Sequence, residues 1–138
     1  MGALTPVLRD FLDANPVGVL ATLPANGRPQ QSLVYCARDG DRLLVSTLAD
    51  RRKARDVRRS GWASLCVMGH DAPYPSATFS GPAEILTEGI AGPTGRIGKR
   101  ITGAPEPPDG LTDAALAEAG RVLLAIDVDR VSAVSYVG

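Results

Sequence analysis

VGVLATLPANGRPQQSLVYCA, residues 17–37, is the stretch of this chain that decides its fold. Residues 17–23 are almost wholly apolar or β-branched, as in a buried strand. The tetrapeptide Pro24-Ala25-Asn26-Gly27 then supplies the Asn-Gly signal of a tight hairpin turn. Residues 30–37 follow as the partner strand, so the stretch predicts an antiparallel β-hairpin.

The flanking sequence extends this hairpin into a larger antiparallel structure. A capping Thr5 and a first-turn Pro6 predict a short amphipathic helix that ends before Pro16. The further strands expected from apolar and β-branched runs span residues 42–47, 63–68, 76–87, 123–128 and 131–137. A parallel sheet would need a helix after each strand, so the predicted fold is mainly β. We expect an antiparallel barrel or sandwich of six to seven strands with short helices, in one domain over residues 1–138.

The region before the last two strands is rich in glycine and proline. Residues 89–110 contain ten Gly or Pro residues in 22, which predicts an exposed connection, although residues 96–102 are compatible with a short helix. Thr112 predicts the cap of a last helix, with Leu111 and Leu116 as a hydrophobic staple across it.

Composition limits the class of protein. The 138 residues carry 15 basic and 15 acidic side chains, and 44% of the chain is apolar, which fits a globular domain and excludes a disordered one. No apolar run is long enough to cross a bilayer, and the N-terminus lacks the pattern of a signal peptide, so a cytoplasmic location is expected. Cys36 and Cys66 are expected to be reduced, buried thiols, and no metal site is predicted.

The densest chemical signal is residues 46–59, STLADRRKARDVRR. If Asp50 caps a helix here, Arg51, Arg52 and Lys53 fill its first turn, where the helix dipole disfavours cations. An anion would compensate, because free backbone N–H groups, the dipole and the cationic side chains converge at a helix N-terminus. The pattern therefore favours a phosphate site, with the hydroxyls of Ser46 and Thr47 nearby.

Two other interpretations of this segment stay open. In the first, the helix has only a solvated charged face, on which Arg52 and Asp56 pair at i, i+4. In the second, the basic helix lies against nucleic acid, but the zero net charge and the six aromatic residues give neither a broad positive field nor a stacking platform.

Few other residues point to chemistry. Gln30 and Ser32 share one strand face, which suits either the edge of a heteroaromatic ring or a solvent-facing stripe. His70 and Asp71 lie in a proline-flanked loop, where a structural or merely exposed role is expected. No catalytic residue is assigned, so a bound cofactor would carry the reactivity of an enzyme.

The order of these motifs resembles the split β-barrel family of pyridoxamine 5′-phosphate oxidase-like flavin and deazaflavin oxidoreductases. The residues that carry the resemblance are strand 17–23, Gly27-Arg28-Pro29-Gln30, strand 43–47 and Arg52-Lys53 before strand 63–68. The resemblance implies that Thr47, Arg52 and Lys53 bind the cofactor phosphate, which agrees with the helix-dipole argument. It also implies a homodimer with the cofactor at the subunit interface.

Pro29-Gln30 and the run Arg-Arg-Lys-Ala-Arg-Asp-Val-Arg-Arg, residues 51–59, are most similar to the branch that uses coenzyme F-420, a deazaflavin of actinobacteria. This similarity implies hydride transfer to an electron-poor double bond in a small organic substrate. Ser46, Arg51 and Arg55 would then extend contacts along the anionic tail, and Gln30 and Ser32 would face the ring. Asp56 departs from the usual Asn. FMN as the cofactor, or a non-catalytic cofactor- or tetrapyrrole-binding protein, are the alternatives.

Overall fold

The structure is a computed structural model and describes residues 3–103 and 111–138. Its elements, in chain order, are α1 (Pro6–Ala14), β1 (Val17–Thr22), β2 (Gln30–Asp39), β3 (Arg42–Leu48), α2 (Arg52–Ser60), β4 (Trp62–Met68), β5 (Ser76–Leu86), α3 (Ala91–Thr102), α4 (Asp113–Glu118), β6 (Arg121–Asp127) and β7 (Arg130–Ser135). No helix in these described ranges is long and apolar enough to span a membrane.

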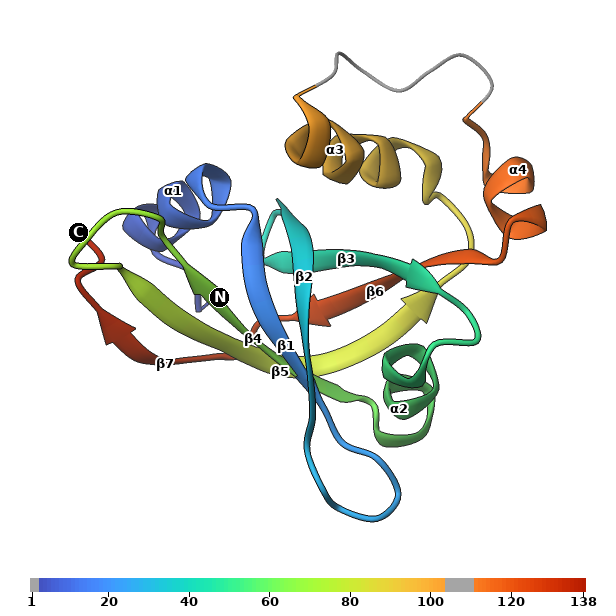
Figure 1. Cartoon of the computed structure of the whole chain (residues 1–138), viewed down its shortest axis with the longest axis horizontal. Helices are drawn as coiled ribbons and strands as arrows, with labels where there is room; N and C mark the ends of the chain where they lie inside the picture. Colours follow the sequence, from blue (N-terminus) through green and yellow to red (C-terminus); the bar gives the residue numbers. More distant parts are fainter. Residues whose placement is uncertain (1–2, 104–110) are drawn as a thin grey trace.

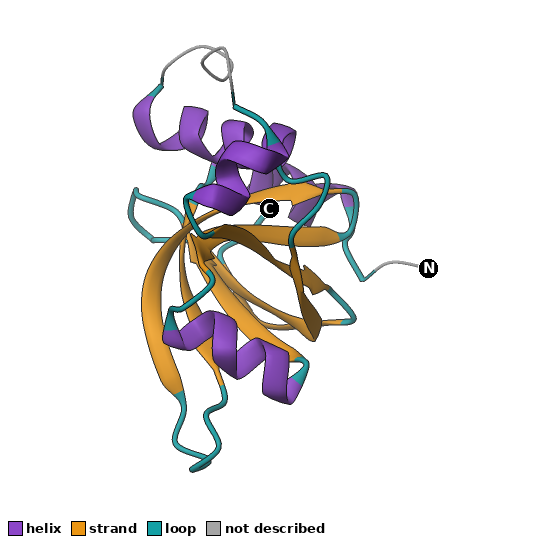
Figure 2. Cartoon of the chain, turned by 90° about the vertical axis from the view of Figure 1, so that its right-hand side faces the viewer, coloured by secondary structure: helices purple, strands orange, loops and turns teal. Residues whose placement is uncertain are grey.

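The strands form a closed antiparallel barrel with one strand added. Neighbouring strands follow the order β4-β1-β2-β3-β6-β5, and a further pairing of β4 with β5 closes the ring. β7 pairs with the first half of β5, outside this ring. α1 lies at one end of the barrel and α2 below its opposite end, while α3 and α4 lie over β3 and β6 (Figure 1). The view in Figure 2 shows the curvature of the sheet around the core.

Gly81 marks the point at which β5 changes partners. Residues 76–80 of β5 pair with β7, and residues 83–86 pair with β6. A Cβ at Gly81 would lie 1.9 Å from the carbonyl oxygen of Asp127, so any side chain there would push β5 away from β6. The close backbone approach explains why glycine stands at this bend.

Two apolar clusters hold the fold together. The first fills the barrel, where alternate residues of β3 such as Leu43 and Val45 pack with Phe79, and α1 covers one end through Leu12. The second lies outside the barrel, between the sheet and the last two helices. It consists of Ala37, Leu44, Ile90, Ile97, Leu116, Leu123 and Ala125. α3 and α4 are therefore packed on the barrel through a core of their own.

The prediction of an exposed connection over residues 89–110 was wrong for the part that the structure describes. Residues 91–102 form the whole of α3, in which Ile97 is buried, and Ile90 just before it is buried as well. Burial of these side chains outweighs the poor helix propensity of the glycines, and Pro93 stands in the first turn, where proline is tolerated. Residues 104–110 of the predicted connection lie outside the described residues.

Several local signals elsewhere in the chain are confirmed. The hairpin of β1 and β2 is present, with Gly27 N–H donating to the carbonyl oxygen of Pro24, and Thr5 and Thr112 cap their helices. Leu116 is buried and Leu111 packs against its cluster, as expected for a staple. Both cysteines are free, but Cys66 is only half-buried, while burial raises the pKa of Cys36 to about 11.

Candidate functional site

α2 starts one residue later than the sequence predicted. Its N-cap is Arg51, whose side chain makes no capping hydrogen bond, so the expectation that Asp50 caps this helix was wrong. Neither residue satisfies the first N–H groups of α2, and no acidic residue stands in its first turn. Arg52 and Lys53 therefore occupy a helix start that carries positive partial charge without local compensation.

The predicted phosphate-binding residues divide between two sides of α2. Successive residues of a helix are rotated by about 100°, so Lys53 faces a different direction from Arg52. Lys53 lines one cavity, which we call the Lys53 cavity, and Arg52 lines another, which we call the arginine cavity. The sequence analysis predicts instead that both side chains bind the same phosphate.

The Lys53 cavity has a volume of about 360 Å³ and is open to solvent on one side. It is bounded by α3, by one face of β2 and by residues at the ends of β3 and β6. Its lining residues are Leu33, Val34, Tyr35, Ser46, Lys53, Thr94, Ile97, Gly98, Ile101 and Arg121. A mostly apolar wall with a few polar groups at its edge is the usual composition of a small-molecule site.

Lys53 is the polar group of this cavity with the clearest need for a ligand. It is half-buried, and within residues 3–103 and 111–138 no carboxylate or carbonyl pairs with its ammonium group. Burial, and then the neighbouring Arg51, lower its pKa from the ordinary value. A bound anion would supply the missing countercharge.

The arginine cavity lies on the other side of α2, against the hairpin turn, and has a volume of about 400 Å³. Two of its three arginines have partners in the protein. Arg52 Nη1 donates to Gln30 Oε1 at 2.8 Å, and Arg59 donates to the carbonyl oxygen of Leu23. Arg55 is exposed and lines the cavity as well.

Asp56 is a buried residue that lines the arginine cavity. Its side chain is only 7% exposed, and Oδ2 accepts a hydrogen bond from the hydroxyl of Thr22 in β1 at 2.9 Å. The pairing of Arg52 with Asp56 that the solvated-face interpretation required is not formed, because Arg52 reaches Gln30 instead. Asp56 thus joins α2 to the barrel.

The remaining predicted site residues are dispersed. Ser46 and Thr47 point to opposite faces of β3, so Ser46 lines the Lys53 cavity and Thr47 is buried on the inner face. Gln30 and Ser32 are both half-buried on one face of β2, which confirms that they share a face. Gln30 reaches α2 through Arg52, and neither residue lines the Lys53 cavity.

α3 forms a wall of the Lys53 cavity that sequence reasoning missed. Its N-terminus has no cap of its own, and the carboxylate of Asp113 in α4 accepts hydrogen bonds from the N–H groups of Gly89, Ile90 and Ala91 at 2.6, 3.0 and 2.9 Å. These bonds lower the pKa of Asp113. Because the folded chain favours the ionised form, this capping stabilises the fold above the ordinary pKa of an Asp and is lost as the pH falls through the lowered value.

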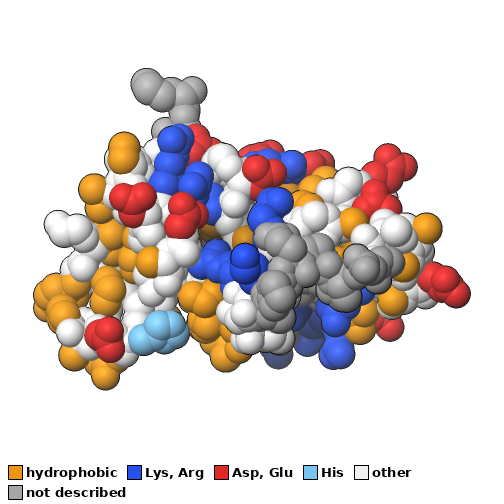
Figure 3. All heavy atoms as spheres, turned by 90° about the horizontal axis from the view of Figure 1, so that it is seen from above, with side chains coloured by type: hydrophobic (Ala, Val, Ile, Leu, Met, Phe, Trp, Pro, Cys, Tyr) orange, Lys and Arg blue, Asp and Glu red, His pale blue; other side chains and the backbone are white. Residues whose placement is uncertain are grey.

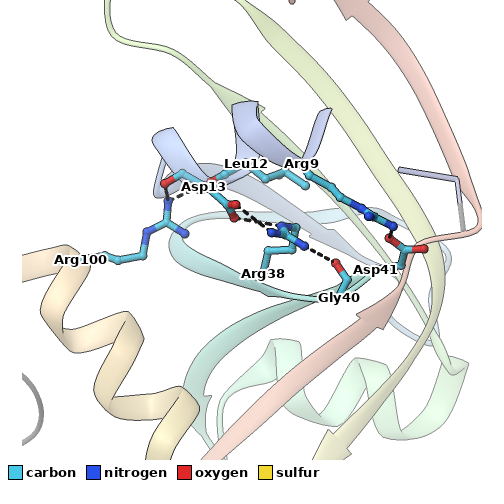
Figure 4. A network of polar contacts seen from close by, with 7 residues as sticks. All are labelled: Arg9, Leu12, Asp13, Arg38, Gly40, Asp41 and Arg100. Carbon is cyan, nitrogen blue, oxygen red and sulfur yellow. Dashed lines mark hydrogen bonds and ion pairs between the residues drawn. The ribbon is translucent and has the colours of Figure 1, made fainter. Parts of the chain in front are cut away.

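The other end of α3 is attached to α1. Arg100 Nη2 donates to the carbonyl oxygens of Leu12 and Asp13, at 2.9 and 3.1 Å, where the C-terminus of α1 favours a cation (Figure 4). Asp13 also accepts two hydrogen bonds from Arg38, which lower the pKa of its carboxyl. The sequence offered no signal for the two bonds of Arg100, because 88 and 87 residues separate it from Leu12 and Asp13.

The basic side chains of α3 lie on the side of the helix that faces α1. Arg96, Lys99 and Arg100 line a separate cavity with Asp13 and Arg38, away from the Lys53 cavity. In the view of Figure 3, Lys and Arg side chains collect in the middle of the face that carries α1 and α3. α3 thus has a charged side toward α1 and an uncharged side toward the Lys53 cavity.

Comparison with known families agrees with this architecture. Residues 4–135 match the family model described as pyridoxamine 5′-phosphate oxidase. The chain belongs to the pyridoxamine 5′-phosphate oxidase family. The predicted mainly β fold and the resemblance to this family are therefore confirmed.

Several solved structures resemble the chain along most of its length. A conserved hypothetical protein of Mycobacterium tuberculosis, Rv2991, is 24% identical, with a TM-score of 0.75, over 94% of this chain and 83% of that one. An F420 reductase is 25% identical, with a TM-score of 0.65, over 89% of this chain and 94% of that one. The heme storage protein HutZ of Vibrio cholerae is 18% identical, with a TM-score of 0.68, over 96% and 94% of the two chains, and shows the shared fold.

Proposed function

We propose that this member of the pyridoxamine 5′-phosphate oxidase family is an oxidoreductase that binds coenzyme F-420 in the Lys53 cavity and reduces a small electron-poor organic substrate. The observation that carries the proposal is the half-buried ammonium of Lys53, which no described residue neutralises, at the edge of an otherwise largely apolar cavity. Similarity to an F420 reductase along 89% of the chain supports the choice of cofactor.

The cavity suits a cofactor with an anionic and an aromatic part. Lys53 and Ser46 would hold phosphate oxygens, and Leu33 and Ile97 would pack on the apolar ring. When bound, a reduced deazaflavin supplies the hydride that saturates a double bond together with a proton from water, and is itself oxidised by two electrons. Arg51 and Arg55 would contact the anionic tail beyond the cavity, with Thr47, Arg52 and the pair Gln30 and Ser32 supporting the site.

We further propose that a second copy of the chain completes the site. Leu33 and Tyr35 on the outer face of β2 are 69% and 41% exposed, and both line the Lys53 cavity. Large apolar side chains exposed beside an open cavity are expected at an interface. A partner subunit covering them would shield the cofactor from water, and each dimer would hold two such sites.

FMN is the alternative cofactor, since it offers one phosphate and the same kind of ring edge.

Storage of a tetrapyrrole is a different class of function, and HutZ is described as a heme storage protein. The residues that line the Lys53 cavity include no His, Cys or Met, and Tyr35 is the one side chain among them of a type that binds heme iron. The chain's one histidine, His70, lies exposed in the loop between β4 and β5.

The test is a fluorescence titration of the purified protein with oxidised F-420 and, separately, with FMN, at two salt concentrations. Tight F-420 binding with weak FMN binding supports the proposal, and the reverse preference assigns the protein to flavin. Binding of neither, alongside tight binding of heme, would replace it with the storage function. Sedimentation of the loaded protein tests the dimer.

A further inference from the structure

The side of α3 that faces the Lys53 cavity carries a defined pattern. Thr94, Ile97, Gly98 and Ile101 have the spacing i, i+3, i+4 and i+7, which places them on one helix face, and all four line the cavity. None of them is charged. The cations of α3 line the separate cavity against α1.

Thr94 carries a polar atom without a partner. Its Oγ1 is buried and makes no hydrogen bond, although its backbone N–H donates to the carbonyl oxygen of Ile90 in the ordinary helical way. A threonine in a helix can turn its hydroxyl to the carbonyl oxygen four residues earlier, and here it does not. An unsatisfied buried hydroxyl is unfavourable in the protein alone, so a ligand that bonds to it would remove that cost.

Gly98 leaves open space on the same helix face, one turn beyond Thr94. A Cβ added at Gly98 would have no heavy atom within 4 Å, so packing inside the protein does not demand glycine there. Glycine within a helix is less stable than alanine, and the left-handed conformation that would justify it is absent at this residue. Because Gly98 lines the cavity, the space at this residue is available to a ligand.

We propose that this face of α3 is the subsite for the substrate, and that it selects an uncharged, flat molecule bearing one hydrogen-bonding oxygen. The molecule lies against Gly98, between Ile97 and Ile101, and its oxygen bonds to Thr94 Oγ1. The assignment of this ligand as the hydride acceptor rests on the proposed function, whereas the binding itself does not. With an anionic cofactor bound at Lys53, an anionic acceptor fits poorly, because the cofactor repels its charge and α3 turns its own cations away from the cavity.

The test measures binding without turnover. Ligand-observed NMR titrations compare cyclohex-2-en-1-one, a neutral enone, with the anionic 3-oxocyclohex-1-ene-1-carboxylate, using protein with and without oxidised F-420. The variants are Thr94→Val, which keeps the side-chain shape, and Gly98→Val, which fills the space. Gly92→Val is the matched control, because Gly92 lies on the same helix, also has open space at its Cβ and does not line the cavity.

In the F-420-loaded protein we expect the neutral enone to bind more tightly than the carboxylate, whereas without the cofactor Lys53 and Arg121 would attract the carboxylate. Gly98→Val should weaken its binding about tenfold or more by steric overlap, and Thr94→Val about three- to tenfold by loss of one hydrogen bond. Gly92→Val should leave it unchanged. A melting temperature of Thr94→Val at or above that of the wild type would show that the hydroxyl does not serve folding.

Three results would overturn the inference: no enone binding to either form of the wild type, equal binding by Gly98→Val, or equal affinity of the F-420-loaded protein for the two enones. Failure of the proposed function looks different. In that case the wild type binds neither F-420 nor FMN, yet its enone binding still depends on Gly98, and the subsite stands while the oxidoreductase role does not.

Discussion

The two cavities beside α2 are built from adjacent residues of one basic run, yet they differ in how their charges are balanced. In the arginine cavity, Arg52 and Arg59 donate to Gln30 and to a backbone carbonyl around the buried Asp56. In the Lys53 cavity, the ammonium group has no protein partner within the described ranges. A cation whose partners lie inside the fold contributes to structure, whereas one left without them is available to a ligand.

The largest effect on cofactor binding is expected from Lys53→Gln, which tests the difference between the two cavities directly. Loss of a charge-assisted hydrogen bond to phosphate should weaken F-420 and FMN binding by about 1.5 to 3 kcal/mol, roughly ten- to a hundredfold. Fluorescence titration measures it, with Arg130→Gln, an exposed cation on β7, as the control. Unchanged affinity in Lys53→Gln would remove Lys53 from the site.

Asp56→Ala tests the structural role of the other side of α2. The substitution leaves the buried hydroxyl of Thr22 without its acceptor and should lower the free energy of unfolding by about 1 to 3 kcal/mol. Urea denaturation measures the loss. Asp50→Ala is the matched control, since Asp50 is exposed and is not the N-cap, and it should change stability by no more than about 0.5 kcal/mol. Equal effects of the two changes would contradict the assignment.

The pH dependence of cofactor affinity should separate the two sides further. Since burial and Arg51 lower the pKa of Lys53, the free protein loses this charge below the ordinary value of 10.5. Affinity for an anionic cofactor should therefore fall as the pH rises toward 10.5. The same lowered pKa makes folding slightly more favourable with rising pH, because the unfolded chain keeps the proton of Lys53 to a higher pH than the folded chain does. Titrations between about pH 7 and 10 measure the fall, which Lys53→Gln should abolish and Arg55→Gln should keep.

The smallest expected effect is that of Arg55→Gln. An exposed guanidinium beside the long tail of F-420 should contribute about 0.2 to 1 kcal/mol, and it should contribute nothing to FMN, which is shorter. Isothermal titration with both cofactors at low salt detects the difference. Equal weakening of both cofactors would instead place the phosphate that F-420 and FMN share in the arginine cavity.

Most of the fold followed from signals that are local in sequence. The Asn-Gly turn, the caps at Thr5 and Thr112 and the shared strand face of Gln30 and Ser32 depend on neighbouring residues, and the structure confirms them. α3 did not follow, because its stability comes from Ile90 and Ile97 buried against distant strands and from a cap supplied by Asp113. Local propensity opposes the helix, and only tertiary packing reverses that preference.

For the candidate site, the cationic run at a helix start predicts an anion site, and this stays a prediction. Lys53 is the half-buried member of that run whose charge no described residue neutralises. The sequence did not reveal that Thr47 faces the barrel interior while Ser46 faces a cavity, nor that Arg52 bonds to Gln30. Thr94 and Gly98 were missed because nothing local marks a helix face that borders a cavity.

The cap that Asp113 gives to α3 has a consequence for how this protein can vary during evolution. The wall of the Lys53 cavity depends on a carboxylate that lies in another helix and lines no part of that cavity. A substitution at Asp113 would loosen α3 and so change the shape offered to a ligand without altering any residue that touches it. Selection for a new substrate could therefore act at α4, where inspection of the cavity alone would not look for it.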